Sequence, residues 1–171
     1  ANYREAYGLF ACSGILFNHE SPLRPERFVT QKVVRAACRI AAGSPERLHL
    51  GNIDIQRDWG WAPEYVDAMW RMLQQDEPRD FVIATGETRP LQDFVAEAFA
   101  AVGLDWQDHV QADASLIRPA DLRSSCANPA LAAERLGWRA STRMSGVVRG
   151  MVDAARADIP AAGQAPPEPV R

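Results

Sequence analysis

Lysine, cysteine and long apolar runs are scarce in this sequence, and each shortage removes a class of protein. Every one of the 19 basic residues except Lys32 is an arginine. The three cysteines are widely spaced and suit neither a disulfide framework nor a zinc site, and no apolar stretch approaches the ~20 residues of a membrane span. The net charge of −3 gives no general attraction to nucleic acid or to an anionic membrane. We therefore expect a protein of the reducing cytoplasm that binds neither.

Several catalytic motifs are also missing. None of the 11 glycines forms the Gly-x-Gly-x-x-Gly turn that holds a dinucleotide, and there is no phosphate loop or Gly-x-Ser-x-Gly elbow. The three histidines are too scattered to indicate a metal site. No Tyr-x-x-x-Lys pair exists, because Phe28 lies four residues before Lys32. The chain thus offers groups that bind a polar or anionic ligand, without a complete catalytic set.

Apolar periodicity predicts strands that alternate with helices. A strand buried on both faces is expected at residues 9–17, and shorter buried strands at 48–51 and 81–84. A helix is expected to end at Gly8, and others are expected at residues 28–42, from 63, at 91–102, after 129 and from 142. The helix that begins near Pro63 is expected to bury Val66, Met69, Trp70 and Leu73. The helices at residues 28–42, at 91–102 and from 142 are expected to bury, in turn, Val29, Val33, Ala36, Ala37 and Ile40; Leu91, Phe94, Val95, Ala98, Phe99 and Val102; and Met144, Val147, Val148, Met151 and Val152.

This alternation predicts an α/β fold. Three strands are few compared with the ~5–6 strands of a typical sheet, so we expect the chain to form one half of a larger fold. We expect residues 1–159 to be ordered and the proline-rich residues 160–171 to form a disordered tail.

The segment of residues 14–28 is the first candidate for ligand binding. An apolar run ends at Phe17, and Asn18 and His19 follow it directly. Pro22 and Pro25 then delay the next helix. Ligands of open α/β sheets bind at the carboxyl ends of strands, so this loop is expected to present an amide, an imidazole and two arginines, Arg24 and Arg27. His19 taken alone is more often a hydrogen-bonded structural histidine than a catalyst.

Three cationic side chains could bind phosphate. Lys32 emerges beside the apolar stripe of its helix, so it either extends to solvent or contacts a phosphate. Arg57 and Asp58 form either a surface ion pair of little worth or a diphosphate contact through the arginine. Arg118 and Asp121 pose the same choice, between a loop salt bridge and an arginine on phosphate with a carboxylate on ribose.

Several longer segments resemble the GDP-mannose 4,6-dehydratase family. They include the sequence Asn-His-Glu-Ser-Pro at residues 18–22 and Arg-Asp-Trp-Gly at residues 57–60, and the likeness runs from Tyr3 to about Val152. The resemblance implies the carboxyl-terminal part of an NAD(P)-binding, Rossmann-like extended short-chain dehydrogenase/reductase with its smaller substrate-binding subdomain. It also implies that the NADP loop and the catalytic Thr, Glu, Tyr and Lys lie ahead of Ala1. We therefore expect the chain alone to be inactive.

The resemblance also assigns binding roles. His19 and Arg24 match NADP-contacting positions. Positions that contact GDP-mannose or a similar GDP-sugar are matched by Asn18, Lys32, Arg57, Arg118 and Asp121. Asp121 replaces the family's usual glutamate. The resemblance implies no metal. It does imply a homo-oligomer, either a dimer or a tetramer.

Three departures from the family pattern leave other functions open. Leu23 replaces an arginine, Gln31 replaces another, and Trp61 replaces a histidine. These changes suggest a diverged branch that acts on another GDP-sugar, such as a GDP-heptose. A GDP-sugar reductase or epimerase of the same family is a separate alternative. A third hypothesis is an inactive fragment that binds only a nucleotide or a partner.

Overall fold

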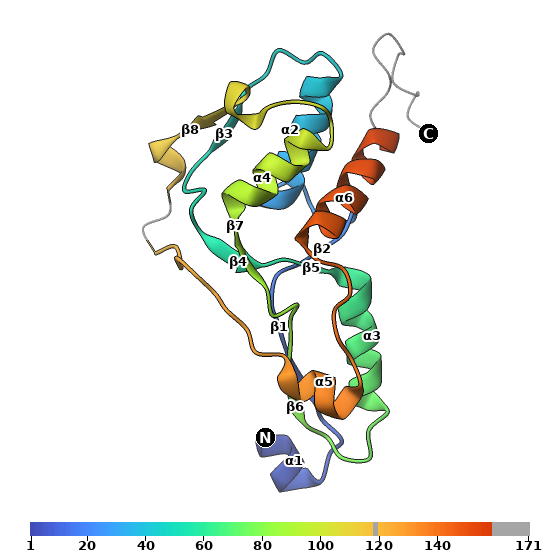
Figure 1. The fold of residues 1–171 in the computed structure, drawn as a ribbon. Coiled ribbons are helices and arrows are strands. Elements are labelled where there is room, and N and C mark those ends of the chain that lie inside the picture. The colour runs from blue at the N-terminus through green and yellow to red at the C-terminus, as the bar shows by residue number, and fades with distance from the viewer. Residues whose placement is uncertain (118–119, 159–171) are drawn as a thin grey trace, which may run out of the picture. The chain divides into compact units, whose positions relative to one another are not determined.

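The computed structural model describes residues 1–117 and 120–158, and these residues form two compact units. Unit 1 comprises Ala1–Ser21, Gln56–Arg89 and Leu122–Val147. Unit 2 comprises Pro22–Ile55 and Pro90–Asp121 and continues from Val148. Strands and helices alternate along the chain (Figure 1), as the α/β prediction requires. The predicted tail, residues 160–171, lies outside the described residues.

The main sheet of unit 1 corrects the prediction for its first strand. Strand β1, Ser13–Leu16, pairs in parallel with β6, Asp80–Ile83, and no other described strand pairs with it. Its first three residues are exposed and Leu16 is only half-buried, so the prediction of burial on both faces is wrong. Such burial requires a strand inside a sheet with helices on both faces, whereas β1 has a single partner strand.

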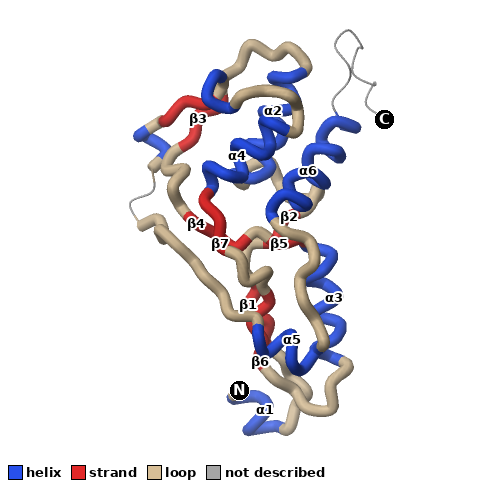
Figure 2. The backbone as a smooth tube through the Cα atoms, in the orientation of Figure 1, coloured by secondary structure: helices blue, strands red, loops and turns tan. Residues whose placement is uncertain are grey.

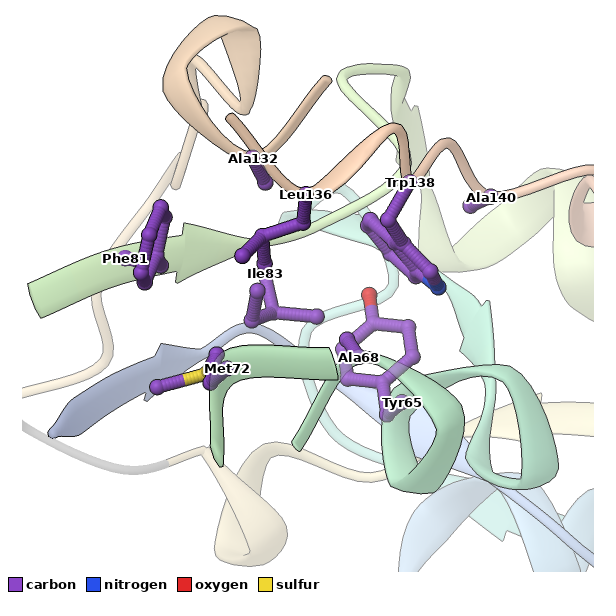
Figure 3. Packing of buried hydrophobic residues seen from close by; sticks show 9 residues of the cluster. All are labelled: Tyr65, Ala68, Met72, Phe81, Ile83, Ala132, Leu136, Trp138 and Ala140. Atoms are coloured by element: carbon purple, nitrogen blue, oxygen red, sulfur yellow. The ribbon is translucent and has the colours of Figure 1, made fainter. Parts of the chain in front are cut away.

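Helix α3, Ala62–Leu73, begins at the predicted place but buries a different face from the predicted one. Its buried residues are Tyr65, Ala68 and Met72, while the four residues expected in the core are exposed. Figure 3 shows the buried three against the two inward residues of β6, Phe81 and Ile83. Leu136 of α5, Ala130–Leu136, and Trp138 complete this core. Both faces of α3 carry apolar residues at helical spacing, so periodicity alone did not identify the inner one.

The remaining strands of unit 1 are too short to show periodicity (Figure 2). Strand β2, His19–Glu20, pairs in parallel with β5, Gly60–Trp61. Strand β4, Gln56–Asp58, pairs with β7, Thr88–Pro90. These pairs were not predicted, because two or three residues contain no measurable alternation.

The first helix, α1, Asn2–Tyr7, ends as predicted at Gly8, whose φ of 62° is left-handed. Arg4 connects α1 to β6 through two hydrogen bonds to Asp80, of 2.5 and 2.8 Å. This contact lowers the pKa of the Asp80 carboxyl far below its usual range. The first helix is therefore held to unit 1 by an ion pair, since it has no buried residue.

Unit 2 is built on two helices that the sequence predicted well. Helix α2, Val29–Ala41, and helix α4, Leu91–Ala100, pack against each other. Both bury the expected apolar stripe except at Val29 and Val102, which are half-buried. Strand β3, Leu48–Leu50, pairs in parallel with β8, Val110–Ala112. Two short 3-10 helices flank β8, η1 at Trp106–Asp108 and η2 at Ala114–Leu116.

The last helix, α6, Met144–Asp158, starts in unit 1 and continues into unit 2. Its predicted apolar face is buried, including Val148, Met151 and Val152. In unit 2 the Cys38 thiol lies 3.9 Å from the Val152 carbonyl oxygen, and Arg35 pairs with Asp158 at 3.0 Å. In residues 1–117 and 120–158, no helix has both the length and the apolar character to cross a membrane.

Candidate functional site

The loop after β1 holds Asn18 and His19 in fixed positions in unit 1. The Asn18 carbonyl oxygen accepts a hydrogen bond of 2.9 Å from the Gly60 amide. The His19 ring places Nδ1 2.8 Å from the carbonyl oxygen of Phe17. A carbonyl oxygen can only accept, so Nδ1 is the protonated nitrogen of the ring. Both residues thus lie at the carboxyl end of β1, where the sequence placed them.

Tyr65 supports His19 and was missed by the sequence analysis. The two rings stack with centroids 4.8 Å apart, and Tyr65 meets Trp138 edge-on at 5.9 Å. Tyr65 is fully buried, and burial together with the nearby Asp58 and Glu64 charges raises the pKa of its phenol well above the usual value. A Cβ at Gly60 would lie 2.4 Å from the Tyr65 ring, so only glycine fits beside it. This close approach explains the glycine of the Arg-Asp-Trp-Gly segment.

Asp58 has an architectural role. The structure places it in the interior instead of in the surface ion pair with Arg57 that was one of the two expectations. Its carboxylate is fully buried and accepts hydrogen bonds from the backbone amides of Thr85 at 2.9 Å and Gly86 at 2.8 Å. It therefore fixes the turn that follows β6. Arg57 is half-buried on β4 and donates to the Gln56 carbonyl oxygen at 2.8 Å. The two bonds of Asp58 explain why an acidic residue is present at this position. They do not explain the presence of Arg57.

Lys32 occupies a polar cluster in unit 2 at the carboxyl ends of β3 and β8. Its ammonium donates a 2.7 Å hydrogen bond to the carbonyl oxygen of His49. Asp113 follows β8, and hydrogen bonds from Ser115 together with the charges of His49 and Lys32 lower the pKa of its carboxyl. The ammonium is therefore held by a backbone carbonyl of β3 instead of extending freely into solvent. His49 and Asp113 lie in no recognised motif, so the sequence alone does not single them out.

Gly51 permits the tight turn beside this cluster. A Cβ there would come within 2.7 Å of the Leu116 carbonyl oxygen, which is backbone and cannot move aside easily. The chain therefore passes close to η2 immediately after β3.

The other predicted residues are placed as follows. The Arg24 guanidinium lies over the Phe28 ring, 4.0 Å from its centroid, in unit 2. Asp121 is half-buried in unit 2, and Arg118 lies outside the described residues. Gln31 is almost fully buried and donates to the Pro22 carbonyl oxygen at 3.3 Å.

The structure thus groups the predicted residues within each unit. Unit 1 holds Asn18, His19 and Arg57, and unit 2 holds Arg24, Lys32 and Asp121. No group of three His, Cys, Asp or Glu side chains in residues 1–117 and 120–158 is arranged to hold a metal ion.

Comparison with known proteins identifies the relatives of this chain. Residues 1–151 match the family described as GDP-mannose 4,6 dehydratase. GDP-mannose 4,6 dehydratase 1 of Arabidopsis thaliana is 50% identical over 152 residues, which cover 89% of this chain and 42% of that protein. The Homo sapiens GDP-mannose 4,6 dehydratase is 42% identical, and the match covers 90% of this chain and 46% of that protein. The chain therefore spans less than half the length of these two relatives.

Solved structures show the same fold over half of their chains. RMD from Pseudomonas aeruginosa, solved in complex with NADPH, has a TM-score of 0.84 at 19% identity, over 92% of this chain and 52% of that one. The dTDP-glucose 4,6-dehydratase of Bacillus anthracis, solved with NAD, has a TM-score of 0.80 at 13% identity, over 92% of this chain and 48% of that one. The chain therefore shares the α/β fold of these two proteins over about half of each of their chains.

Proposed function

The chain belongs to the GDP-mannose 4,6-dehydratase family, and we propose that it supplies the GDP-sugar-binding half of such an enzyme. The observation that carries the proposal is the extent of the match, residues 1–151, which includes both units. In this proposal unit 1 is the carboxyl-terminal part of the Rossmann-like domain. Unit 2 is the smaller substrate-binding subdomain.

Lys32 is the proposed phosphate ligand of unit 2. The carbonyl of His49, the central residue of β3, holds its ammonium beside the parallel pair of β3 and β8. The carboxyl ends of such strands are the usual ligand-binding end of an α/β sheet. A positive charge at that end suits the diphosphate of a GDP-sugar. Asp121, with its carboxylate, is proposed to accept hydrogen bonds from the ribose hydroxyls. Arg118 is proposed to contact the diphosphate as well.

Asn18 and Arg57 are the proposed GDP-sugar contacts of unit 1. The amide of Asn18 can donate and accept, which suits sugar hydroxyls, and the guanidinium of Arg57 suits a phosphate. His19 and Arg24 are the proposed NADP contacts. The residues fit that role chemically, since the stacked His19 ring is held in a single orientation and Arg24 carries a positive charge for an anionic cofactor.

The proposed reaction converts GDP-mannose to GDP-4-dehydro-6-deoxy-mannose. His19 and Arg24 would hold NADP, which would supply the hydride acceptor and donor for an internal redox reaction between C4 and C6 of the sugar, with loss of water across C5 and C6. The residues of this chain bind and orient the GDP-sugar for these steps. The groups that transfer protons are proposed to lie in the part of the family that this chain does not match. The enzyme is proposed to act as a cytoplasmic homo-oligomer.

A chimera tests this proposal directly. Residues 1–151 would replace the matching region of the Arabidopsis thaliana relative, and GDP-mannose turnover would be measured with NADP. We expect turnover by the chimera and no turnover by the isolated chain. The Lys32→Ala and Arg57→Ala variants of the chimera should lose GDP-mannose affinity strongly. A correctly folded chimera without turnover would contradict the proposed reaction. Turnover by the isolated chain would contradict the proposal that the proton-transferring groups lie in the part of the family that this chain does not match.

A related GDP-sugar is the second candidate substrate. Gln31 occupies a position where the resemblance implies arginine, and its buried amide is bonded to the Pro22 carbonyl oxygen. One positive charge is therefore absent near the loop that carries Arg24. Assaying the same chimera with a GDP-heptose and with GDP-mannose would distinguish the two substrates.

A further inference from the structure

The imidazole ring of His19 lies against the buried ring of Tyr65, and the strand pairing of unit 1 makes room for this contact. The two ring centroids are 4.8 Å apart, and the ring planes are inclined by 26°. In the parallel pair of β2 and β5, the residue directly opposite His19 is Gly60. A Cβ at Gly60 would lie 2.4 Å from the hydroxyl oxygen of Tyr65. The missing side chain opposite His19 is therefore what admits the tyrosine ring.

A second aromatic contact fixes the Tyr65 ring. Trp138 meets it edge-on, with centroids 5.9 Å apart and planes at 86° (Figure 3). The Trp138 indole N–H donates a 3.0 Å hydrogen bond to the carbonyl oxygen of Glu64, the residue before Tyr65 in α3. Tyr65 itself is fully buried. Because a close-packed core leaves little space for movement, the ring presents a rigid surface to His19.

The ring of Tyr65, and not its hydroxyl, makes the contact with His19. The hydroxyl oxygen is buried and has no hydrogen-bond partner among the described residues. A buried hydroxyl without a partner lowers stability. The stacked geometry brings the face of the phenol ring onto the imidazole. Phenylalanine at this position would therefore keep the contact and remove an unsatisfied polar group.

A hydrogen bond sets the tautomer of His19. Its Nδ1 lies 2.8 Å from the carbonyl oxygen of Phe17, which can only accept, so Nδ1 carries the proton. The hydrogen bond fixes this nitrogen, and the stacking contact with Tyr65 fixes the plane of the ring. In a neutral ring of this tautomer, Nε2 accepts hydrogen bonds. Such a ring suits a hydroxyl or amide donor of a dinucleotide better than one of its phosphates.

We propose that Tyr65 is a positioning residue, which holds the His19 ring in the Nδ1–H tautomer and in one plane for its contact with NADP. The contact with NADP rests on the proposed function, whereas the hold on His19 is a property of this chain. Without the stacked ring, the imidazole could turn away from the Phe17 carbonyl, and its two tautomers would interconvert. Tyr65 thus affects the cofactor contact through His19.

Nitrogen NMR of the full chain, labelled with ¹⁵N at its histidines, tests the hold on His19 without any cofactor. The shifts of Nδ1 and Nε2 report which nitrogen carries the proton, and spectra recorded at about pH 8 report neutral rings. The His19→Gln variant assigns the His19 signals among those of the three histidines. We expect the wild-type chain to show the Nδ1–H tautomer of His19 alone. A wild-type His19 with its proton on Nε2 would overturn the proposal.

Four substitutions separate the stacking contact from general packing. Tyr65→Leu removes the ring, so His19 should show a mixture of both tautomers. Gly60→Ala keeps the tyrosine but displaces its ring, and it should have the same effect, which decides the question if the leucine variant does not fold. Tyr65→Phe should keep the wild-type signals. Phe81→Leu is the matched control, because Phe81 is also buried in the core that contains Tyr65, and it should leave the His19 signals unchanged.

The NADP affinity of the chimera links this hold to the proposed function. Tyr65→Leu should raise the dissociation constant for NADP about 3- to 10-fold, the worth of one neutral hydrogen bond, whereas Tyr65→Phe and Phe81→Leu should not change it. Wild-type His19 signals in Tyr65→Leu would overturn the proposal, as would an equal change in Phe81→Leu or an NADP affinity that Tyr65→Leu leaves unchanged. A chimera that binds no NADP would contradict the proposed function, and the two failures are distinguishable because the tautomer is measured without cofactor.

Discussion

Replacing Asp58 with asparagine tests whether the Arg-Asp-Trp-Gly segment is organised around a buried carboxylate. The two oxygens of Asp58 accept the Thr85 and Gly86 amides at 2.9 and 2.8 Å. Asparagine has the same shape but a single oxygen, and its NH₂ group would face an amide that also donates. One charge-assisted hydrogen bond is lost and one buried N–H is left unsatisfied. Together these changes should lower the free energy of unfolding by about 2–4 kcal/mol.

Urea unfolding followed by circular dichroism measures this loss. Asp54→Asn is the control, because it removes the same charge from an exposed position four residues earlier. The control should change the free energy of unfolding by no more than ~0.5 kcal/mol. If Asp58→Asn were as mild as the control at an unchanged slope against urea, the architectural role of Asp58 would be refuted.

Two further predictions concern unit 1. Gly60→Ala places a Cβ 2.4 Å from the buried Tyr65 ring, so it should lower the free energy of unfolding by about 1–3 kcal/mol in the same urea assay; a variant as stable as wild type would contradict the close packing. The ion pair with Arg4 depresses the pKa of folded Asp80, so its contribution to stability is present above the unfolded pKa of about 4 and is lost as the pH falls toward the folded value. Asp80→Asn should therefore be less stable than wild type at pH 7, with a difference that narrows below about pH 4; a difference independent of pH would contradict the ion pair.

The longer helices could be predicted from the sequence because their apolar residues recur on one side only. The helix at residues 28–42 is α2, and its expected stripe is buried at Val33, Ala36, Ala37 and Ile40, with Val29 half-buried. The helix expected from Pro63 is α3, but its burial was predicted on the wrong side. Periodicity identifies a face that needs covering, and it does not say whether this chain covers it. The exposed face of α3 and the exposed strand β1 are the two places where that distinction matters.

The candidate site was only partly visible in the sequence. Asn18 and His19 could be placed at the end of a strand, because an apolar run ends directly before them. Tyr65 and His49 could not be found, because each makes its contact with a residue distant in sequence. Asp113 bonds to the nearby Ser115, and no motif marks it. The burial of Asp58 could not be predicted either, since a single acidic residue beside an arginine usually lies on the surface.

GDP binding by the chain, measured by isothermal titration calorimetry, tests the central claim that it carries the GDP-sugar contacts. Lys32→Ala should raise the dissociation constant about 10- to 100-fold, the worth of one hydrogen bond to a charged phosphate. Arg47→Ala removes an equal charge from an exposed position of the same unit and should leave the dissociation constant unchanged. Wild-type and Lys32→Ala proteins that bind GDP equally, or a wild-type chain that does not bind GDP, would contradict the account.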